Sequence, residues 1–288
     1  MGISRFGFIA ILFPLFAFTS DKPAYVIFNI EGEKSTYGQM IADLEKADIV
    51  FIGELHNNSI AHWLEYEITS DLFELRGGEL ILGAEMFERD NQLVIEEYMT
   101  GFYKADKFEA EAKLWENYTT DYKPLLEFAR ENSLPFLATN IPRRYASMVD
   151  KGGFEVLDPL SQEAKSYIAP LPIVYDPEVK CYKDMMESQD MGPHVTENFP
   201  KAQAVKDATM AHSILENWNR GKLFIHFNGA YHSRNFEGII WYINQMRPGL
   251  KIVTVETIVQ KEIDGLDEEN IGIASYVVGV PESMTNTY

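Results

Sequence analysis

Short apolar runs separated by stretches with helical spacing constrain the fold of this chain most strongly. The runs are typical of strands and cover residues 25–30, 49–53, 79–84, 134–139, 222–228, 251–257 and 272–279. Strands that are apolar along nearly their whole length are typical of a sheet that is covered on both faces. The alternation therefore predicts an α/β fold with a mostly parallel sheet, helices on both faces and a small helical insertion.

The segments between these runs carry helix signals. Asn58 or Ser59 can cap a helix whose apolar residues recur at helical spacing and which ends at Gly77-Gly78. Residues 120–131 and 142–151 are also predicted to be helical. The second of these begins with Pro142, in a position where a helix tolerates proline.

Residues 157–200 interrupt the alternation. This stretch is rich in proline and tyrosine, contains the pair Met185-Met186 and has no strand pattern. It is predicted to be an insertion of short helices and loops between two strands. Long insertions of this kind are often lids or binding elements, and the alternative is a surface appendage without function. One α/β domain over residues 21–288 is expected to carry it.

The composition limits the partners of the chain. Its formal net charge of −19 argues against nucleic acid or an anionic membrane surface as a partner. Cys181 is the single cysteine, so no intrachain disulfide can form and a cysteine-based zinc or iron–sulfur site is excluded.

The N-terminus has the pattern of an export signal. A positive charge at Arg5 precedes the apolar run Phe6–Phe18, and small or polar residues follow it. The run is shorter than the roughly 20 residues of a membrane-spanning helix. We therefore predict a signal peptide over residues 1–20 and a mature protein that is exported to the periplasm or the extracellular face. The alternative is a retained N-terminal anchor, whereas a lipoprotein anchor would need a cysteine there.

Two segments share the pattern G-x-x-H, and each follows a predicted strand. Gly53–His56 comes after Ile49–Ile52, and Gly229–His232 comes after Leu223–Phe227. Residues just past the carboxyl ends of parallel strands line the ligand crevice of an open sheet. Glycine permits a tight turn there, and the histidine three residues later can point into the crevice. The pair therefore predicts one site built from both segments.

Other strand ends add polar side chains to this predicted site. Together, four strand ends supply Glu54, His56, Glu85, Asn140, Arg143, Asn228 and His232. Carboxylates and imidazoles that converge can hold a divalent metal ion, or they can carry out acid–base chemistry without a metal. Arg143, at a predicted helix N-terminus, can bind a carboxylate or a phosphate. Taken singly, a glutamate at such a position is as well explained as a helix cap or an ion-pair partner.

The remaining histidines and one further helix complete the candidates. His226 lies within a strand and is expected to be a core residue, whereas His62 and His194 are expected on the surface or the lid. The helix 201–220 has an alanine-rich core stripe. Its neighbouring face, with Gln203, Lys206, Asp207, Met210 and Ser213, either borders the crevice or faces solvent; Asp207 and Met210 are its candidate pocket residues.

The order of these motifs resembles the ChaN-like haem-binding uptake family of the Tiki superfamily. The matching segments are Phe51–His56, Leu82–Phe87, Thr139–Arg143, Gln203–Ala211 and Asn228–His232. The resemblance implies an exported protein that binds haem through a tyrosine, in some members as haem pairs between subunits. The candidate tyrosines are Tyr145, Tyr167, Tyr175, Tyr182 and Tyr231.

A second branch of the superfamily implies a different activity. It contains metal-dependent proteases that use two G-x-x-H motifs and a glutamate, and related enzymes cleave macrolide esters. His56, His232 and Glu85 match that set, with Glu54 beside them, and these four are the predicted catalytic and metal-binding residues.

Two hypotheses follow. The first is an exported haem-binding protein of haem or iron uptake, with haem as ligand and a homodimer as one arrangement. Its predicted cofactor-binding residues are Tyr145, Tyr175, Tyr182, Met210, Asp207, Asn140, Arg143 and Tyr231. The second is a metal-dependent peptidase or esterase that uses a divalent ion. Both expect no nucleic acid partner, and a membrane contact only through an uncleaved N-terminal anchor.

Overall fold

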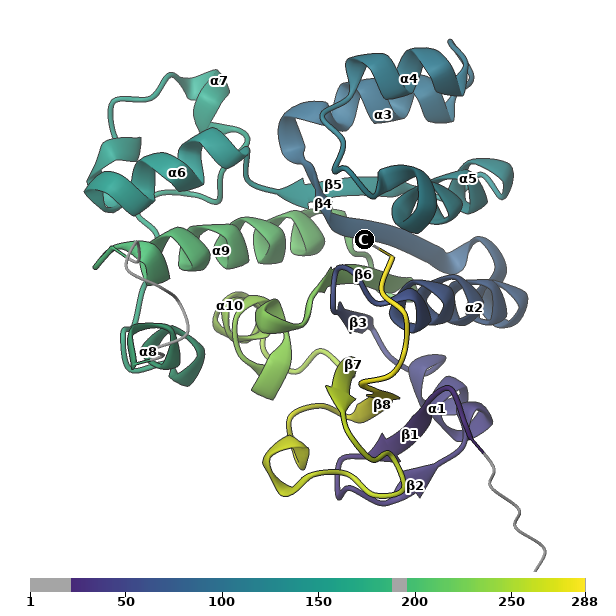
Figure 1. The fold of residues 1–288 in the computed structure, drawn as a ribbon. Helices are drawn as coiled ribbons and strands as arrows, with labels where there is room; N and C mark the ends of the chain where they lie inside the picture. Colours follow the sequence, from purple (N-terminus) through teal and green to yellow (C-terminus); the bar gives the residue numbers. More distant parts are fainter. Residues whose placement is uncertain (1–21, 188–195, 288) are drawn as a thin grey trace, which may run out of the picture.

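An eight-stranded sheet with the order β2-β1-β8-β7-β3-β6-β4-β5 forms the centre of the molecule (Figure 1). The computed structural model describes residues 22–187 and 196–287. The five pairs from β8 across to β5 are parallel, and β1 pairs antiparallel with β2 and β8. The predicted α/β fold is confirmed. The strands are β1 (Val26–Asn29), β2 (Lys34–Ser35), β3 (Ile49–Glu54), β4 (Leu80–Glu88), β5 (Phe136–Asn140), β6 (Leu223–Gly229), β7 (Ile252–Gln260) and β8 (Tyr276–Pro281).

Helices cover both faces of the sheet, as predicted. Side chains of α1, α2, α3, α4 and α5 pack in one hydrophobic layer, and those of α6, α8, α9 and α10 pack in the other (Figure 1). Alternate residues of β3 point into the two layers, with Val50 in the first and Phe51 in the second. The helices are α1 (Tyr37–Leu44), α2 (Ser59–Arg76), α3 (Gln92–Met99), α4 (Ala105–Glu111), α5 (Lys123–Glu131), α6 (Arg143–Gly152), α7 (Gln162–Lys165), α8 (Lys180–Glu187), α9 (Phe199–Asn217) and α10 (Ile239–Met246).

Local sequence explains several helix boundaries. Asn58 caps α2 because its side chain accepts hydrogen bonds from the backbone N–H groups of Ile60 and Ala61. The same helix ends at Gly77, whose φ of 54° suits glycine. Pro142 directly precedes α6, in agreement with the prediction that this helix begins with proline.

The structure differs from the sequence-based prediction in a few elements. The two-residue strand β2 is too short to leave a pattern in the sequence. β4 continues to Glu88 instead of ending at residue 84, because its pairing with β6 ends at Ala84 while a bulge keeps it paired with β5. In the described part of residues 157–200, α7 and α8 are short helices between loops, as predicted. The predicted signal peptide lies outside the described residues.

The order of the strands brings the two G-x-x-H segments together. β3 lies between β7 and β6, and β6 separates β3 from β4. Gly53 is in register with Asn228, and Glu54 with Gly229, so the two segments leave neighbouring parallel strands side by side. The C-terminal tail returns to the same place, where the N–H of Thr287 donates to the carbonyl of Asn57 at 2.8 Å.

Candidate functional site

The two motifs need glycine because a larger side chain would collide with neighbouring residues. A Cβ on Gly53 would lie 2.3 Å from Oε2 of Glu256, and a Cβ on Gly229 would lie 2.9 Å from Nε2 of His56. Gly53 has an ordinary strand conformation and Gly229 has a negative φ, so neither position needs glycine for a tight turn. The predicted motif is present, but its glycines serve close approach of side chains.

The first motif fixes its histidine through a neighbouring glutamate. Nδ1 of His56 donates to Oε1 of Glu54 at 2.6 Å, and the hydroxyl of Tyr122 donates to the same oxygen at 2.7 Å. Burial alone would lower the pKa of His56, but the hydrogen bond and charge of Glu54 outweigh it and raise that pKa. Nε2 of His56 lies beside Gly229 at the cavity floor.

The second motif fixes its histidine through residues that are distant in sequence. Nδ1 of His232 donates to Oδ1 of Asp207 at 2.5 Å, and Nε2 lies 3.1 Å from Oε1 of Glu85. The hydroxyl of Tyr182 donates to the other oxygen of Asp207 at 2.7 Å. Burial would lower the pKa of His232, but the charges of Glu85 and Asp207 raise it to about 10. His232 is therefore an imidazolium held between two carboxylates.

Glu85 connects the sheet to the second motif. Its Oε2 accepts a hydrogen bond from the backbone N–H of Gly229 at 2.8 Å. Burial would raise the pKa of Glu85, but the charge and hydrogen bond of His232 lower it to about 2. Glu85 is thus a buried carboxylate with each oxygen engaged.

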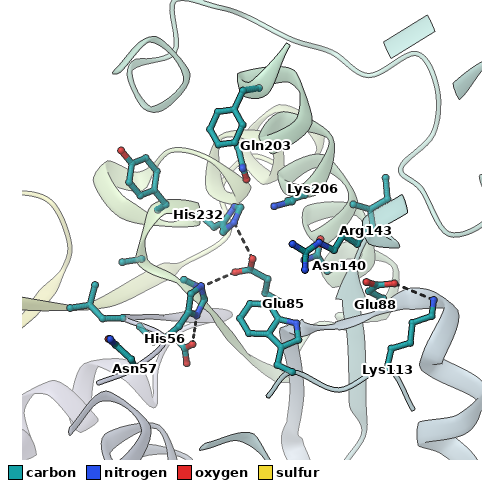
Figure 2. A pocket seen from close by; sticks show the side chains of 18 of the residues that line it. His56, Asn57, Glu85, Glu88, Lys113, Asn140, Arg143, Gln203, Lys206 and His232 are labelled. Atoms are coloured by element: carbon teal, nitrogen blue, oxygen red, sulfur yellow. Dashed lines mark hydrogen bonds and ion pairs between the residues drawn. The ribbon is translucent and has the colours of Figure 1, made fainter. Parts of the chain in front are cut away.

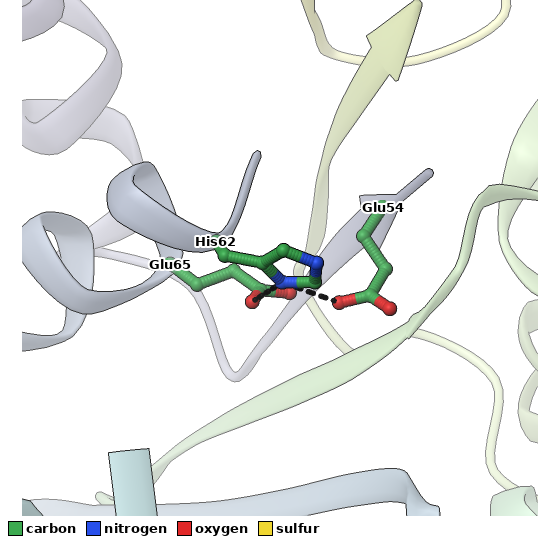
Figure 3. Close-up of side chains that lie close together, drawn as sticks. All are labelled: Glu54, His62 and Glu65. Carbon is green, nitrogen blue, oxygen red and sulfur yellow. Dashed lines mark hydrogen bonds and ion pairs between the residues drawn. The ribbon is translucent and has the colours of Figure 1, made fainter. Parts of the chain in front are cut away.

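Behind His56 lies a buried charged cluster of Glu54, His62 and Glu65 (Figure 3). Nδ1 of His62 donates to Oε2 of Glu65 at 3.1 Å and lies 3.3 Å from Oε2 of Glu54. Nε2 of His62 donates to the carbonyl of His56 at 3.1 Å. Burial would lower the pKa of His62, but both glutamates raise it to about 11. The prediction of a surface position for His62 was wrong, because this imidazolium compensates the buried carboxylate of Glu54.

A cavity of about 820 Å³ opens in front of both histidines (Figure 2). Trp115 forms part of its wall, and the ring of Trp115 contacts that of His56 edge-on at a centroid distance of 4.9 Å. Its lining residues are Glu54, Leu55, His56, Asn57, Glu85, Glu88, Lys113, Leu114, Trp115, Asn140, Ile141, Arg143, Met185, Phe199, Gln203, Lys206, Gly229, Ala230, Tyr231 and His232. This volume falls in the range of cofactor and small-molecule sites.

The cavity contains most of the predicted site residues. Seven of the residues predicted as catalytic, metal-binding or cofactor-binding line it, namely Glu54, His56, Glu85, Asn140, Arg143, Tyr231 and His232. Their placement together follows from the parallel strand ends, but their roles stay predictions. Gln203 and Lys206, on the α9 face that was predicted either to border the crevice or to face solvent, line the cavity too.

Other predicted cofactor-binding residues lie outside the cavity wall. Met210 is fully buried in the hydrophobic layer of α9, so its prediction as a pocket residue was wrong. Tyr145 is buried in the same layer, and Tyr175 packs against Tyr182. The hydroxyl of Tyr182 is engaged by Asp207, and Asp207 itself lies behind His232.

Three other residues that the sequence singled out do not line the cavity in the described structure. Asn228 is buried and donates to Ser233 at 2.9 Å instead of lining the cavity. His226 is a buried core residue, as predicted, and burial lowers its pKa to about 4. His194 lies outside the described residues.

Several residues of the site could not be identified from the sequence. Trp115 and Lys113 belong to an irregular segment after α4 that carries no strand or helix pattern. Tyr122 lies in a π-helical turn before α5, where nothing in the sequence connects it with Glu54. The spacing of His62 and Glu65, three residues apart on one helix, was the one available signal of the charged cluster.

The cavity offers a phenol from Tyr231 and an imidazole from His56 among mostly polar lining residues. Within residues 22–187 and 196–287, the ligand atoms that gather within 4.8 Å of one another belong to Glu54, His62 and Glu65, and not to His56, Glu85 and His232.

The covered, mostly parallel sheet defines an α/β domain with a cavity at the carboxyl ends of its strands. The family model described as haem-binding uptake, Tiki superfamily, ChaN matches residues 40–243, and the chain belongs to this family. No curated protein matches the chain. None of the described helices is long and apolar enough to cross a membrane.

The chain is similar to several solved structures. A structure described as cofacial haem binding to ChaN of Campylobacter jejuni has a TM-score of 0.66 and 19% identity, over 88% of this chain and 96% of that one. A Bacillus cereus protein has a TM-score of 0.48 and 11% identity, over 86% and 92%. A mutant erythromycin esterase has a TM-score of 0.47 and 10% identity, over 88% and 83%. The first of these supports a common fold.

Proposed function

We propose that this protein binds haem in the cavity between the two G-x-x-H segments, with Tyr231 as the ligand of the iron. The observation that carries the proposal is the state of Tyr231. It lines the cavity, is 53% exposed, and within the described residues its hydroxyl makes no hydrogen bond. An aromatic side chain with a free hydroxyl in a cavity is available to a ligand, and a tyrosine phenolate is an established haem ligand.

The other candidate tyrosines are less available. Tyr182 is buried and donates to Asp207, and Tyr145 is buried beneath Arg144. Tyr167 and Tyr175 are partly buried and do not line the cavity. The proposal therefore assigns the tyrosine ligand of the family to Tyr231.

His56 and His232 differ in how readily they could contact the bound haem. His232 has both ring nitrogens engaged by carboxylates, so it would have to lose a proton and a partner to bind a metal. His56 has its Nδ1 held by Glu54 and also interacts with Glu85 (Figure 2), but 37% of its side chain is exposed. His56 is therefore the histidine better placed to hydrogen-bond an iron-bound group.

A haem titration of the full chain, followed by visible absorption, tests the proposal. We expect saturable binding and a spectrum of tyrosinate-ligated ferric haem. Tyr231→Phe should lose that spectrum, while the matched control Tyr175→Phe should retain it. An unchanged spectrum on adding haem to the wild-type chain would refute haem binding. Binding that is identical in Tyr231→Phe would refute the assigned ligand alone.

Export, a part in haem or iron uptake and a homodimer belong to the same proposal. The support for export is the signal-like N-terminus, and the support for uptake and pairing is membership of the family. Mass spectrometry of the protein recovered from its native cells checks the cleavage near residue 20. Light scattering with and without haem checks the homodimer.

A second candidate function is metal-dependent hydrolysis. One observation favours it: two histidines whose Nδ1 atoms are each held by a carboxylate flank the single carboxylate Glu85. Carboxylates that hold Nδ1 orient an imidazole toward a metal through Nε2. Stoichiometric divalent metal that disappears in His56→Ala and His232→Ala, but not in the surface variant His212→Ala, would support it. Metal-free protein after loading with Zn²⁺ would exclude it.

A further inference from the structure

Two cationic side chains of the cavity form no ion pair within the described residues. Lys113 is paired with Asp90 at 2.7 Å and with Glu88 at 3.4 Å. By contrast, Arg143 and Lys206 line the cavity without an ion pair to any residue in the described ranges, although the charge of Lys206 contributes to the lowered pKa of Glu85. This is unusual in a chain whose formal net charge is −19, because carboxylates are abundant. Two unpaired cations in one cavity indicate that an anionic group belongs between them.

Asn140 supplies a second, independent indication. It is only 8% exposed and lines the cavity, and its side-chain amide makes no hydrogen bond within the described residues, so its Nδ2–H is free to donate to an anionic acceptor. A buried amide without a partner is costly, and native proteins rarely leave one unless a ligand or water completes it. Figure 2 shows Asn140, Arg143 and Lys206 on one side of Glu85, and His56 on the other.

The start of α6 favours the same kind of ligand. This ten-residue helix has no side-chain cap at Pro142 and no acidic residue in its first turn. Its first N–H groups and its dipole therefore add positive potential beside Arg143.

We propose that Asn140, Arg143 and Lys206 form a subsite for a carboxylate group of the ligand. This inference rests on the proposed function, since the propionates of haem are such carboxylates. The subsite fixes the orientation of the porphyrin, with its carboxylate edge toward α6 and its centre toward Tyr231 and His56. Arg143 supplies two parallel N–H donors, Lys206 a point charge and Asn140 an amide donor.

The test compares ferric protoporphyrin IX with its dimethyl ester, in which both carboxylates are masked. Each is titrated into the full-length wild-type chain and into the double variant Arg143→Gln/Lys206→Gln. The wild type should bind the diacid at least about tenfold more tightly than the ester, the effect of one charge-assisted hydrogen bond. The double variant should bind both porphyrins alike.

A matched control removes the same charge outside the cavity. Arg144 is the next residue of α6, pairs with Asp90 and does not line the cavity. Arg144→Gln should keep the preference for the diacid, which separates the subsite from a general loss of positive charge.

The possible failures are distinguishable. Equal affinity of the wild type for diacid and ester would overturn the carboxylate subsite while haem binding stands. Absence of binding of both porphyrins would instead contradict the proposed function. Competition by inorganic phosphate, with no preference for the diacid, would assign the three residues to phosphate and overturn the carboxylate assignment.

Discussion

The two G-x-x-H segments share a pattern but hold their histidines in different environments. His56 depends on Glu54, two residues earlier, and 37% of its side chain is exposed. His232 depends on Asp207 of α9 and on Glu85 of β4, and 9% of its side chain is exposed. Both histidines therefore pair with carboxylates, but the first is exposed to the cavity and the second is nearly buried.

The environments of the two histidines also have a feature in common. In each, a tyrosine hydroxyl and the histidine Nδ1 donate to one carboxyl group, with Tyr122 and Glu54 in the first and Tyr182 and Asp207 in the second. The anchor of the first histidine lies in the motif itself, whereas that of the second comes from elsewhere in the fold. A short motif thus locates a side chain, but the surrounding fold determines its protonation state and accessibility.

Removing the imidazole of His62, which lies behind the first G-x-x-H segment, should have the largest effect on stability. His62→Gln removes one of the two imidazoles that pair with the buried carboxylate of Glu54, which should lower the free energy of unfolding by about 3–5 kcal/mol. Urea denaturation at pH 7 measures this loss. His212→Gln is the matched control, since His212 is partly exposed and pairs with the exposed Glu216, and it should cost less than about 1 kcal/mol. Equal losses in the two variants would contradict the buried charge network.

A pH-dependent effect is expected at Glu256, which joins the two segments. Its carboxyl group lies against Gly53 and accepts a hydrogen bond from Ser233 at 2.6 Å. Burial raises its pKa to about 8 from the ordinary 4.5. Between these values the folded protein keeps a proton that the unfolded chain releases, so stability falls as the pH rises.

Glu256→Gln should remove this loss. At about 1.4 kcal/mol per pH unit above 4.5, the variant should be more stable than the wild type by about 3 kcal/mol at pH 7. The gain should vanish near pH 4.5. Denaturation at both pH values measures it, with the exposed Glu79→Gln as a control that changes stability by less than about 0.5 kcal/mol. A gain that does not depend on pH would show that Glu256 is ionised in the folded state.

The smallest effects are expected from the two tyrosines. Tyr122→Phe and Tyr182→Phe each remove one hydrogen bond to a buried carboxylate, and each should cost about 1–2 kcal/mol. Thermal denaturation compares them. A loss in one variant alone would mean that the two arrangements are similar only in geometry.

The fold was largely predictable from local patterns. Apolar runs located the seven longer strands, and Asn58 with Gly77 located both ends of α2. β2 could not be predicted because two residues are too few to show an alternating apolar pattern. The signal peptide and the assignment of the lid stay predictions.

The site was predictable only in part, for a physical reason. Strand ends are brought together by the parallel sheet, so His56, Glu85 and His232 could be expected in one place. Asp207 and Met210 lie three residues apart on α9, yet one holds His232 and the other packs in the core. Helical spacing could not distinguish these two because the difference depends on which way α9 faces the sheet.

A crystal structure of the full chain with ferric haem would show whether the cavity between the two segments is the haem site. We expect iron bonded to Oη of Tyr231 inside the cavity, with His56 beside it and the porphyrin carboxylates toward Arg143 and Lys206. Haem bound elsewhere on the molecule, with the side chains of Tyr231 and His56 unchanged, would contradict this expectation.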